Sequence, residues 1–236
     1  MTDRVVQILI SAFPKLLLYC VKVTIPLTVI VFVLSIIIAL GTALVQIYHV
    51  KVLDRVARFY IWLFRGTPLI VQLYIIFFGL PSLGIMINAY VSAVIAFSLN
   101  YAAYNSETIR AAILAVPEGQ TEAGYMIGLN RFQIMTRIVL PQATRIAFPT
   151  LMGSLIGLTK DSSLAASITV VEMFKTAQQI AASTYEPFAL YCEAAVIYLL
   201  LCSLLTLLQG RIEKSLVWKR NEPQNNDIQK GAVQNG

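Results

Sequence analysis

The chain has 236 residues, of which 58% are hydrophobic and only 13% are charged, and its mean hydropathy is +0.73. A soluble domain of this length has less apolar and more charged residues, so the composition excludes an ordinary soluble protein. The net charge is +6. Because the basic residues lie between apolar runs, they indicate orientation in a bilayer rather than nucleic-acid binding.

The first 18 residues are mixed in polarity, and their apolar residues Val5, Ile8, Leu9 and Ala12 fall on one helical face. This pattern predicts an amphipathic helix over residues 1–18 that lies in the membrane interface. The stretch lacks the cleavage pattern of a secretory signal peptide. We therefore expect the first membrane span to act as the insertion signal.

Five apolar stretches follow, each long enough to cross about 30 Å of hydrocarbon as an α-helix. The predicted spans cover residues 23–45, 59–80, 90–109, 146–171 and 189–208. The third and fourth spans carry polar side chains that lipid cannot satisfy, so we expect these side chains to face protein or water. The sequence thus predicts an all-α, polytopic membrane domain over residues 19–215 and a disordered polar tail over residues 216–236.

The basic residues predict the orientation of these spans. Lys and Arg concentrate in residues 46–58, in residues 110–145 and in the tail, whereas the connection 81–89 has none and 172–188 has only Lys175. Since cytoplasmic segments carry the excess of Lys and Arg, the N-terminus is predicted outside and the C-terminus inside. Lys15 and Lys22, near the outer end of the first span, oppose this orientation.

The connection over residues 116–142 reads as two short helices. Pro117 breaks the preceding helix, Glu118 and Glu122 suit the first turns of a new one, and Gly128 suits its end. Residues 131–139 can form the second helix. On physical grounds alone, this helix-turn-helix is as compatible with an ordinary amphipathic connector as with a binding element.

Residues of this loop fall at a recognisable spacing: Glu122, Ala123, Gly124, Gly128, Leu129, Ile138, Leu140 and Pro141. The pattern resembles the EAA loop of permeases from binding-protein-dependent ABC importers. The resemblance implies that the loop forms a coupling helix that docks in a groove of an ATP-hydrolysing subunit, and that seven of these residues take part: Glu122, Ala123, Gly124, Gly128, Leu129, Leu140 and Pro141. Only Gly124 departs from the pattern, since a second Ala is usual there, and we expect it to loosen the helix slightly.

Three further segments, residues 65–72, 104–110 and 160–164, resemble the permeases for polar amino acids, which import histidine, glutamine, arginine or cystine. The resemblance covers residues 15–215 approximately. It implies the type I ABC importer permease fold with five transmembrane helices, in a prokaryotic plasma membrane. It also implies an assembly with a second permease subunit (identical or homologous), an ATPase dimer, an extracellular or periplasmic binding protein and an amino-acid substrate.

The energy source is expected to lie on another chain. The sequence contains no Gly-x-x-x-x-Gly-Lys-Ser/Thr loop and no Gly-Lys pair at all. We therefore expect no cofactor and no metal on this chain, with ATP and Mg²⁺ bound by the partner ATPase. The chain is accordingly predicted to be a transport subunit and not an enzyme.

Two charges inside predicted spans suggest an ion pair. Arg65 lies about 9 Å inside the cytoplasmic start of the second span, and Glu107 lies at a comparable depth in the third. Charges in a membrane normally face protein or a water-filled path. The hypothesis is that Arg65 and Glu107 pair and help to close the inner end of the pathway; a purely structural pair is the alternative.

Other polar residues are candidates for the substrate pathway. Asn100 and Tyr104 fall on one helical stripe with Glu107, and this stripe either lines the pathway or joins helices by hydrogen bonds. The cluster Lys160, Asp161, Ser162 and Ser163 suggests a broken helix near mid-membrane, in which Lys160 would bind the carboxylate of an amino acid and Asp161 its ammonium group. The same two charges could instead pair with Glu172 or with the partner subunit.

Other functions fit the sequence less well. The only histidine is His49, in a basic loop, and no Ser or Cys has a nearby His, which disfavours a membrane hydrolase. No selectivity-filter sequence and no inverted repeat is evident, which disfavours a channel or a secondary transporter. A membrane scaffold would not need charges within its spans.

Overall fold

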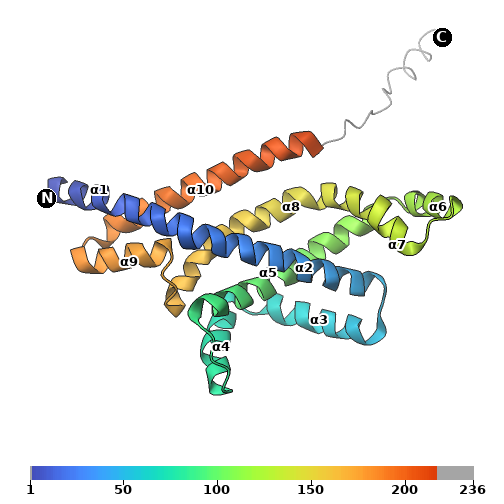
Figure 1. The fold of residues 1–236 in the computed structure, drawn as a ribbon, viewed down its shortest axis with the longest axis horizontal. Helices are drawn as coiled ribbons and strands as arrows, with labels where there is room; N and C mark the ends of the chain where they lie inside the picture. The colour runs from blue at the N-terminus through green and yellow to red at the C-terminus, as the bar shows by residue number, and fades with distance from the viewer. Residues whose placement is uncertain (1, 217–236) are drawn as a thin grey trace, which may run out of the picture.

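The computed structural model describes residues 2–216, and these are almost entirely helical (Figure 1). This confirms the all-α prediction for the described part of the chain. The predicted tail over residues 216–236 lies, except for its first residue, outside the described residues. The helices run mainly along one direction, and the loop that contains α6 and α7 forms one end of the molecule.

The chain begins with one long helix. Helix α1 (Thr2–Tyr19) continues through a π-helical turn (Cys20–Thr24) into α2 (Ile25–Ile47), and residues 3–47 form a single apolar helix. The prediction of a separate helix over residues 1–18 is therefore wrong. Pro26 follows one residue after the π turn, and the wider turn accommodates its ring and its missing N–H without ending the helix.

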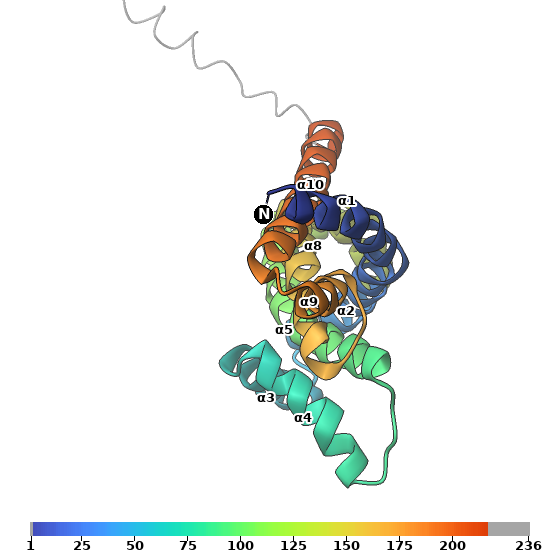
Figure 2. The same ribbon diagram turned by 90° about the vertical axis from the view of Figure 1, so that its left-hand side faces the viewer.

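The second predicted span, residues 59–80, is also wrong as a single helix. Helix α3 (Lys51–Gly66) and helix α4 (Leu69–Ser82) meet at an angle of 107°. Thr67 and Pro68 between them are extended, because a proline cannot continue the helix that precedes it. Figure 2 shows that α3 and α4 lie outside the ring formed by the other long helices.

The centre of the bundle is formed by α2, α5 (Ala89–Leu114) and α8 (Leu140–Asp161). Small residues line their contacts and allow the helix backbones to approach closely. The buried alanines of this region are Ala39, Ala43, Ala102, Ala112, Ala143 and Ala147. The fourth predicted span, residues 146–171, is not one α-helix either, because α8 gives way to a 3₁₀ segment (Ser162–Ile168) that ends at Thr169 with φ +68°.

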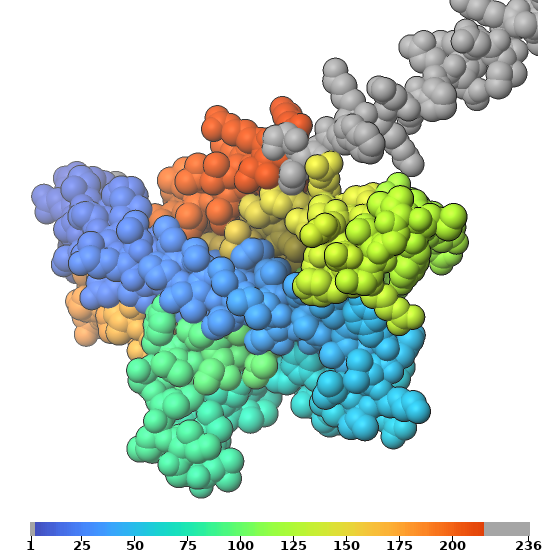
Figure 3. All heavy atoms as spheres, turned by 45° about the vertical axis from the view of Figure 1, so that its right-hand side comes forward, coloured from blue at the N-terminus to red at the C-terminus, as the bar shows by residue number. Residues whose placement is uncertain are grey.

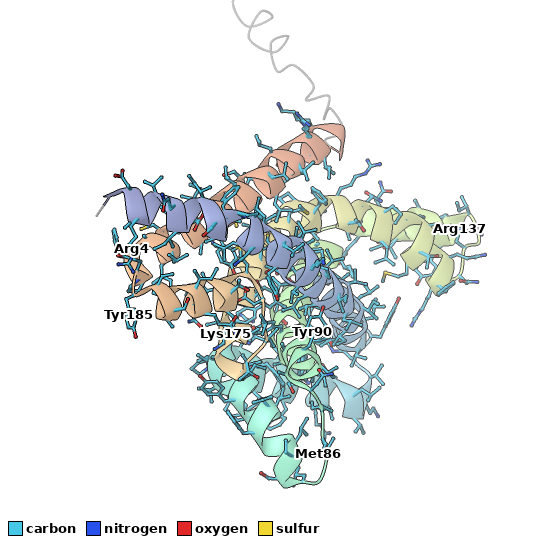
Figure 4. All side chains as sticks on the ribbon, turned by 60° about the vertical axis from the view of Figure 1, so that its left-hand side comes forward. Arg4, Met86, Tyr90, Arg137, Lys175 and Tyr185 are labelled. Carbon is cyan, nitrogen blue, oxygen red and sulfur yellow. The ribbon has the colours of Figure 1, made fainter. Side chains whose placement is uncertain are left out.

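The C-terminal part packs against the first helix. Helix α9 (Met173–Thr184), which was predicted only as a connection, and α10 (Pro187–Leu216) enclose one apolar cluster with α1. Leu16 and Met173 in this cluster are fully buried. In Figure 4 Arg4 and Tyr185 lie at the end of the molecule opposite to Arg137, which belongs to the loop between α5 and α8, and Arg4 donates a hydrogen bond of 3.1 Å to the carbonyl of Thr184.

By length and apolar composition, two of the described helices qualify as membrane spans: residues 3–47 and Pro187–Lys214. A third qualifies if the bent pair α3–α4 counts as one span. Helices α5 and α8 fall short, in keeping with the polar side chains noted in the sequence. The number of five spans and the orientation of the termini stay predictions.

Candidate functional site

An open cavity of about 610 Å³ lies where the break between α3 and α4 meets α5 and α8. Five of the residues singled out from the sequence line it: Arg65, Asn100, Tyr104, Glu107 and Asp161. The third span supplies the stripe that was predicted, since Asn100, Tyr104 and Glu107 share one face of α5. The structure thus brings together polar residues from three separate predicted spans.

Two amide side chains hold the broken helix in place. The side chain of Gln72 donates hydrogen bonds to the carbonyls of Phe64 and Thr67, at 2.8 and 3.1 Å, and to the Thr67 hydroxyl at 2.7 Å. Asn100 donates to the carbonyl of Phe64 at 3.3 Å and to Oε1 of Gln72 at 3.0 Å. These bonds replace the helical partners that the break removes, which a lipid environment requires.

Asn100 therefore both lines the cavity and joins helices, so the two interpretations of this residue are compatible. Gln72 was missed as a site residue, although an amide within an apolar stretch is the signal that would have found it.

The predicted pair of Arg65 with Glu107 is not formed in the described structure. Glu107 pairs with Arg110, one turn further along α5, at 2.8 Å. Arg65 instead lies over the ring of Tyr104, with its Cζ 5.4 Å from the ring centroid, as in a cation–π contact. The depth of the two residues was judged from the sequence, but the direction of each side chain around its helix was not.

Asp161 is the last α-helical residue before α8 passes into the 3₁₀ segment. The hydroxyl of Tyr101 donates a hydrogen bond of 2.7 Å to Oδ2 of Asp161. The cavity is lined by the cation Arg65 and by two carboxylates, Asp161 and Glu107. Because Glu107 pairs with Arg110, Arg65 and Asp161 are the two opposite charges that suit a zwitterion.

Lys160 does not share this cavity. With Ser163 it lines a second, mostly apolar cavity of about 540 Å³ between α8, α9 and α10, where Tyr198 and Cys202 are also found. Ser162 is fully buried and donates to the carbonyl of Thr159 at 2.7 Å. Adjacent helical residues point about 100° apart, so only Asp161 of the predicted cluster reaches the first cavity.

The loop over residues 116–142 forms the two predicted helices. Helix α6 (Glu118–Met126) follows Pro117 and ends before Gly128, whose φ of +80° suits a residue without a side chain. Helix α7 (Arg131–Ile134) continues into a π-helical turn (Met135–Val139). Asn130 and Gln133 form a reciprocal capping box with two bonds of 2.9 Å, which fixes the start of α7.

The expectation that Gly124 loosens the helix stays a prediction, but the structure gives glycine a packing role at this position. It is buried, and a Cβ atom built on it would lie 2.9 Å from Cγ1 of Ile134 and 3.1 Å from Cδ1 of Ile138. No side chain fits in this space without movement of the isoleucines. Glycine at this position lets α6 pack directly against the segment after α7.

The outer surface of the loop is apolar and exposed. Met126 is 87% exposed, and Ile127 and Phe132 are each 75% exposed. Glu122, Ala123 and Pro141 are also exposed, whereas Leu129 and Leu140 are half-buried. Figure 3 shows this loop as a protruding end of the molecule. An exposed apolar patch at such a tip is typical of a protein-binding surface.

Comparison with known proteins agrees with this arrangement. The family of binding-protein-dependent transport system inner membrane components matches residues 31–218. The L-cystine transport system permease protein TcyB of Bacillus subtilis (strain 168) is 48% identical over 194 residues, covering 82% of this chain and 83% of that protein. A probable amino-acid ABC transporter permease protein, PatM of Vibrio harveyi, is 39% identical over 78% of this chain and 84% of its own length.

Solved structures show the same fold. A crystal structure of an amino acid ABC transporter with histidines superposes with a TM-score of 0.77 and 30% identity, over 91% of this chain and 96% of that one. An inward-facing structure of the MetNI methionine ABC transporter has a TM-score of 0.73 and 20% identity, over 86% and 97% of the two chains, which shows the fold alone. The protein is thus a multi-pass protein of the plasma membrane. The chain belongs to the family of binding-protein-dependent transport system inner membrane components, the permease subunits of ABC importers.

Proposed function

We propose that this permease forms the pathway for uptake of a polar amino acid, with L-cystine as the first candidate, driven by ATP hydrolysis on a separate subunit. The single observation that carries the proposal is the polar cavity at the α3–α4 break. Its volume of about 610 Å³ lies within the range of small-molecule sites. The resemblance to permeases that are named for cystine and other amino acids supports the same class of substrate.

An α-amino acid is a zwitterion and needs both charges satisfied. We assign its ammonium group to Asp161, which is held by Tyr101 in the cavity. Arg65 replaces Lys160 as the partner of the carboxylate, because Arg65 lines this cavity and Lys160 lines the other one. Asn100 and Tyr104 shape the wall between the two charges.

The cavity also supports the need for a second permease subunit. Arg65 and Tyr104 are exposed in the single chain, although both belong to the polar cavity. Lipid cannot solvate a guanidinium group at low cost, so a second copy or a homologous permease would cover this face. The pathway then lies between the two subunits.

The loop around α6 is the part of the permease that binds the ATPase. Its exposed apolar tip, with Glu122 and Ala123 beside it, suits a groove of an ATP-binding cassette ATPase, which binds the ATP and Mg²⁺. A binding protein outside the membrane delivers the substrate. Closure of the ATPase dimer moves the loops and switches the pathway between outward-open and inward-open states.

The test is reconstitution of the permease with its ATPase in liposomes, together with the cognate binding protein. We expect uptake that requires ATP for L-cystine or another polar amino acid among histidine, glutamine and arginine. Asp161→Asn should raise the KM for uptake, while Lys160→Gln, which removes the neighbouring charge, should have a smaller effect. Failure of every one of these amino acids to be taken up or to stimulate ATP hydrolysis would contradict the proposal.

A further inference from the structure

Glu172 is a buried carboxylate that lines neither cavity described above. Glu172 is 0% exposed, and it lies between the 3₁₀ segment Ser162–Ile168 and the start of α9. The sequence gives no reason to expect a fully buried acid here, since 172–188 reads as a connection. Within residues 2–216, which the structure describes, Glu172 forms no ion pair.

The Glu172 carboxylate accepts four hydrogen bonds and donates none of them. Oε1 accepts from the backbone N–H of Lys175 at 2.7 Å, and Oε2 accepts from that of Phe174 at 2.8 Å. Oε2 also accepts from the hydroxyls of Tyr198, at 3.2 Å, and Thr24, at 3.4 Å. A set of donors alone suits an ionised carboxylate, and the N-terminus of α9 adds the favourable end of a helix dipole.

The donors come from three elements that are far apart in the sequence. The two backbone donors cap α9, as an N-cap residue ordinarily does. The other two are not needed for capping: Thr24 belongs to the π-helical turn between α1 and α2, and Tyr198 belongs to α10. The Thr24 hydroxyl also accepts a bond of 3.3 Å from the N–H of Met173. Glu172 thus joins α9 to both neighbouring helices.

This network leads to the transport cavity. The hydroxyl of Tyr198 lies beside the side chain of Ser162, which follows directly after Asp161. Ser162 begins the 3₁₀ segment, and the segment packs against α9. Figure 4 shows Lys175, in the first turn of α9, at the end of that helix nearest the rest of the bundle, with Tyr185 at the other end. The network is therefore connected, through the 3₁₀ segment, to the end of α8 that carries Asp161.

We propose that Glu172 is a positioning residue for transport, which through Tyr198 and Ser162 holds the end of α8 so that Asp161 faces the substrate cavity. Glu172 itself does not contact the substrate. The inference rests on the proposed function, because it gives Asp161 the task of binding the ammonium group. It adds a residue outside the cavity, on which the affinity for the amino acid depends.

Tyr198→Phe is the sharpest variant for a test, because it removes one donor to Glu172 and leaves the cap of α9 intact. The probe is ATP-dependent uptake of radiolabelled L-cystine by reconstituted liposomes of the full complex. We expect the KM to rise about three- to tenfold while the maximal rate stays near that of the unaltered protein. Thr176→Val is the matched control: its hydroxyl is buried in the same turn but bonds to the backbone carbonyl of Glu172, so KM should not change.

Glu172→Gln should raise KM further. The glutamine amide has one oxygen that accepts and one NH₂ group that donates. The NH₂ group would face groups that are themselves donors, so part of the network is lost. Should this variant fail to fold, Tyr198→Phe still decides the question.

A double-mutant cycle shows whether the effect passes through Asp161. In an Asp161→Asn background, adding Tyr198→Phe should change KM by less than twofold, because coupled residues are not additive. Independent effects of the two substitutions, or an unchanged KM in Tyr198→Phe, would overturn the inference while leaving the role of Asp161 intact. An unchanged KM in Asp161→Asn itself would overturn the proposed role of Asp161 and this inference with it.

Discussion

Replacing Gly124 by alanine tests how the loop that contains α6 and α7 is built. The new Cβ would lie 2.9 Å from Cγ1 of Ile134 and 3.1 Å from Cδ1 of Ile138, so both isoleucines must move. Forcing an extra methyl group into a packed site costs about 1–3 kcal/mol. Alanine gains about 1 kcal/mol over glycine within a helix, which offsets part of this cost. The expected net destabilisation of the loop is about 1 kcal/mol.

This cost should be visible in the affinity of the permease for its ATPase, measured in detergent with purified subunits. Where the lost stability falls entirely on the docked conformation of the loop, about 1 kcal/mol weakens binding by about fivefold, which is the upper bound of the expected effect. Gly119→Ala is the matched control, because Gly119 lies in the same helix and a Cβ there meets nothing within 4 Å. Gly119→Ala should therefore bind the ATPase as tightly as the unaltered protein or slightly more tightly.

The reasoning also predicts coupling with Ile134. In an Ile134→Ala background the 2.9 Å contact is absent and only the 3.1 Å contact with Ile138 remains, so Gly124→Ala should cost less there by about 1 kcal/mol. Equal costs in the two backgrounds, or a Gly124→Ala variant that behaves as Gly119→Ala does, would refute the account of a close approach at this position.

Three further predictions follow from the described contacts. Asp161→Asn should raise the KM of uptake about tenfold or more and Lys160→Gln by less than threefold, as measured by uptake of labelled amino acid into liposomes; equal effects would contradict the separation of the two cavities. Asn130→Ala removes the cap of α7 and should destabilise it by about 0.5–2 kcal/mol, detected as faster amide hydrogen exchange in residues 131–134, whereas unchanged exchange would argue against the cap. Gln72→Leu leaves the Phe64 carbonyl with one donor fewer and should destabilise the protein by about 1–3 kcal/mol, measured as a lower Tm; a Tm that does not fall would show that the break needs no amide.

Long apolar stretches were predictable because helix length and hydropathy depend on the sequence alone. The parts of α2, α5 and α10 that cross the bundle lie where the pattern placed them. The bend at Pro68 was not predicted, because an apolar window averages over a proline that lies in its middle. A chain-breaking triplet, Gly66-Thr67-Pro68, was the signal that the average concealed.

Contacts across helices were the least predictable part of the site. Arg65 and Glu107 were predicted to pair because they lie at similar depths in their spans. In the structure Glu107 pairs with Arg110 on its own helix, and Arg65 lies over the ring of Tyr104. Rotation about the helix axis decides such contacts, and packing sets that rotation. Glu172 was considered only as a possible partner of Lys160 or Asp161, since nothing local shows that Thr24 and Tyr198 converge on it.

The uninterrupted helix over residues 3–47 has a mechanical consequence. At 1.5 Å per residue its 45 residues extend about 68 Å, more than twice the thickness of the hydrocarbon layer. A rod of this length converts a tilt of about 5° into a displacement of about 6 Å at its far end. A small tilt of this helix at one side of the membrane therefore displaces its other end by about the pitch of one helical turn.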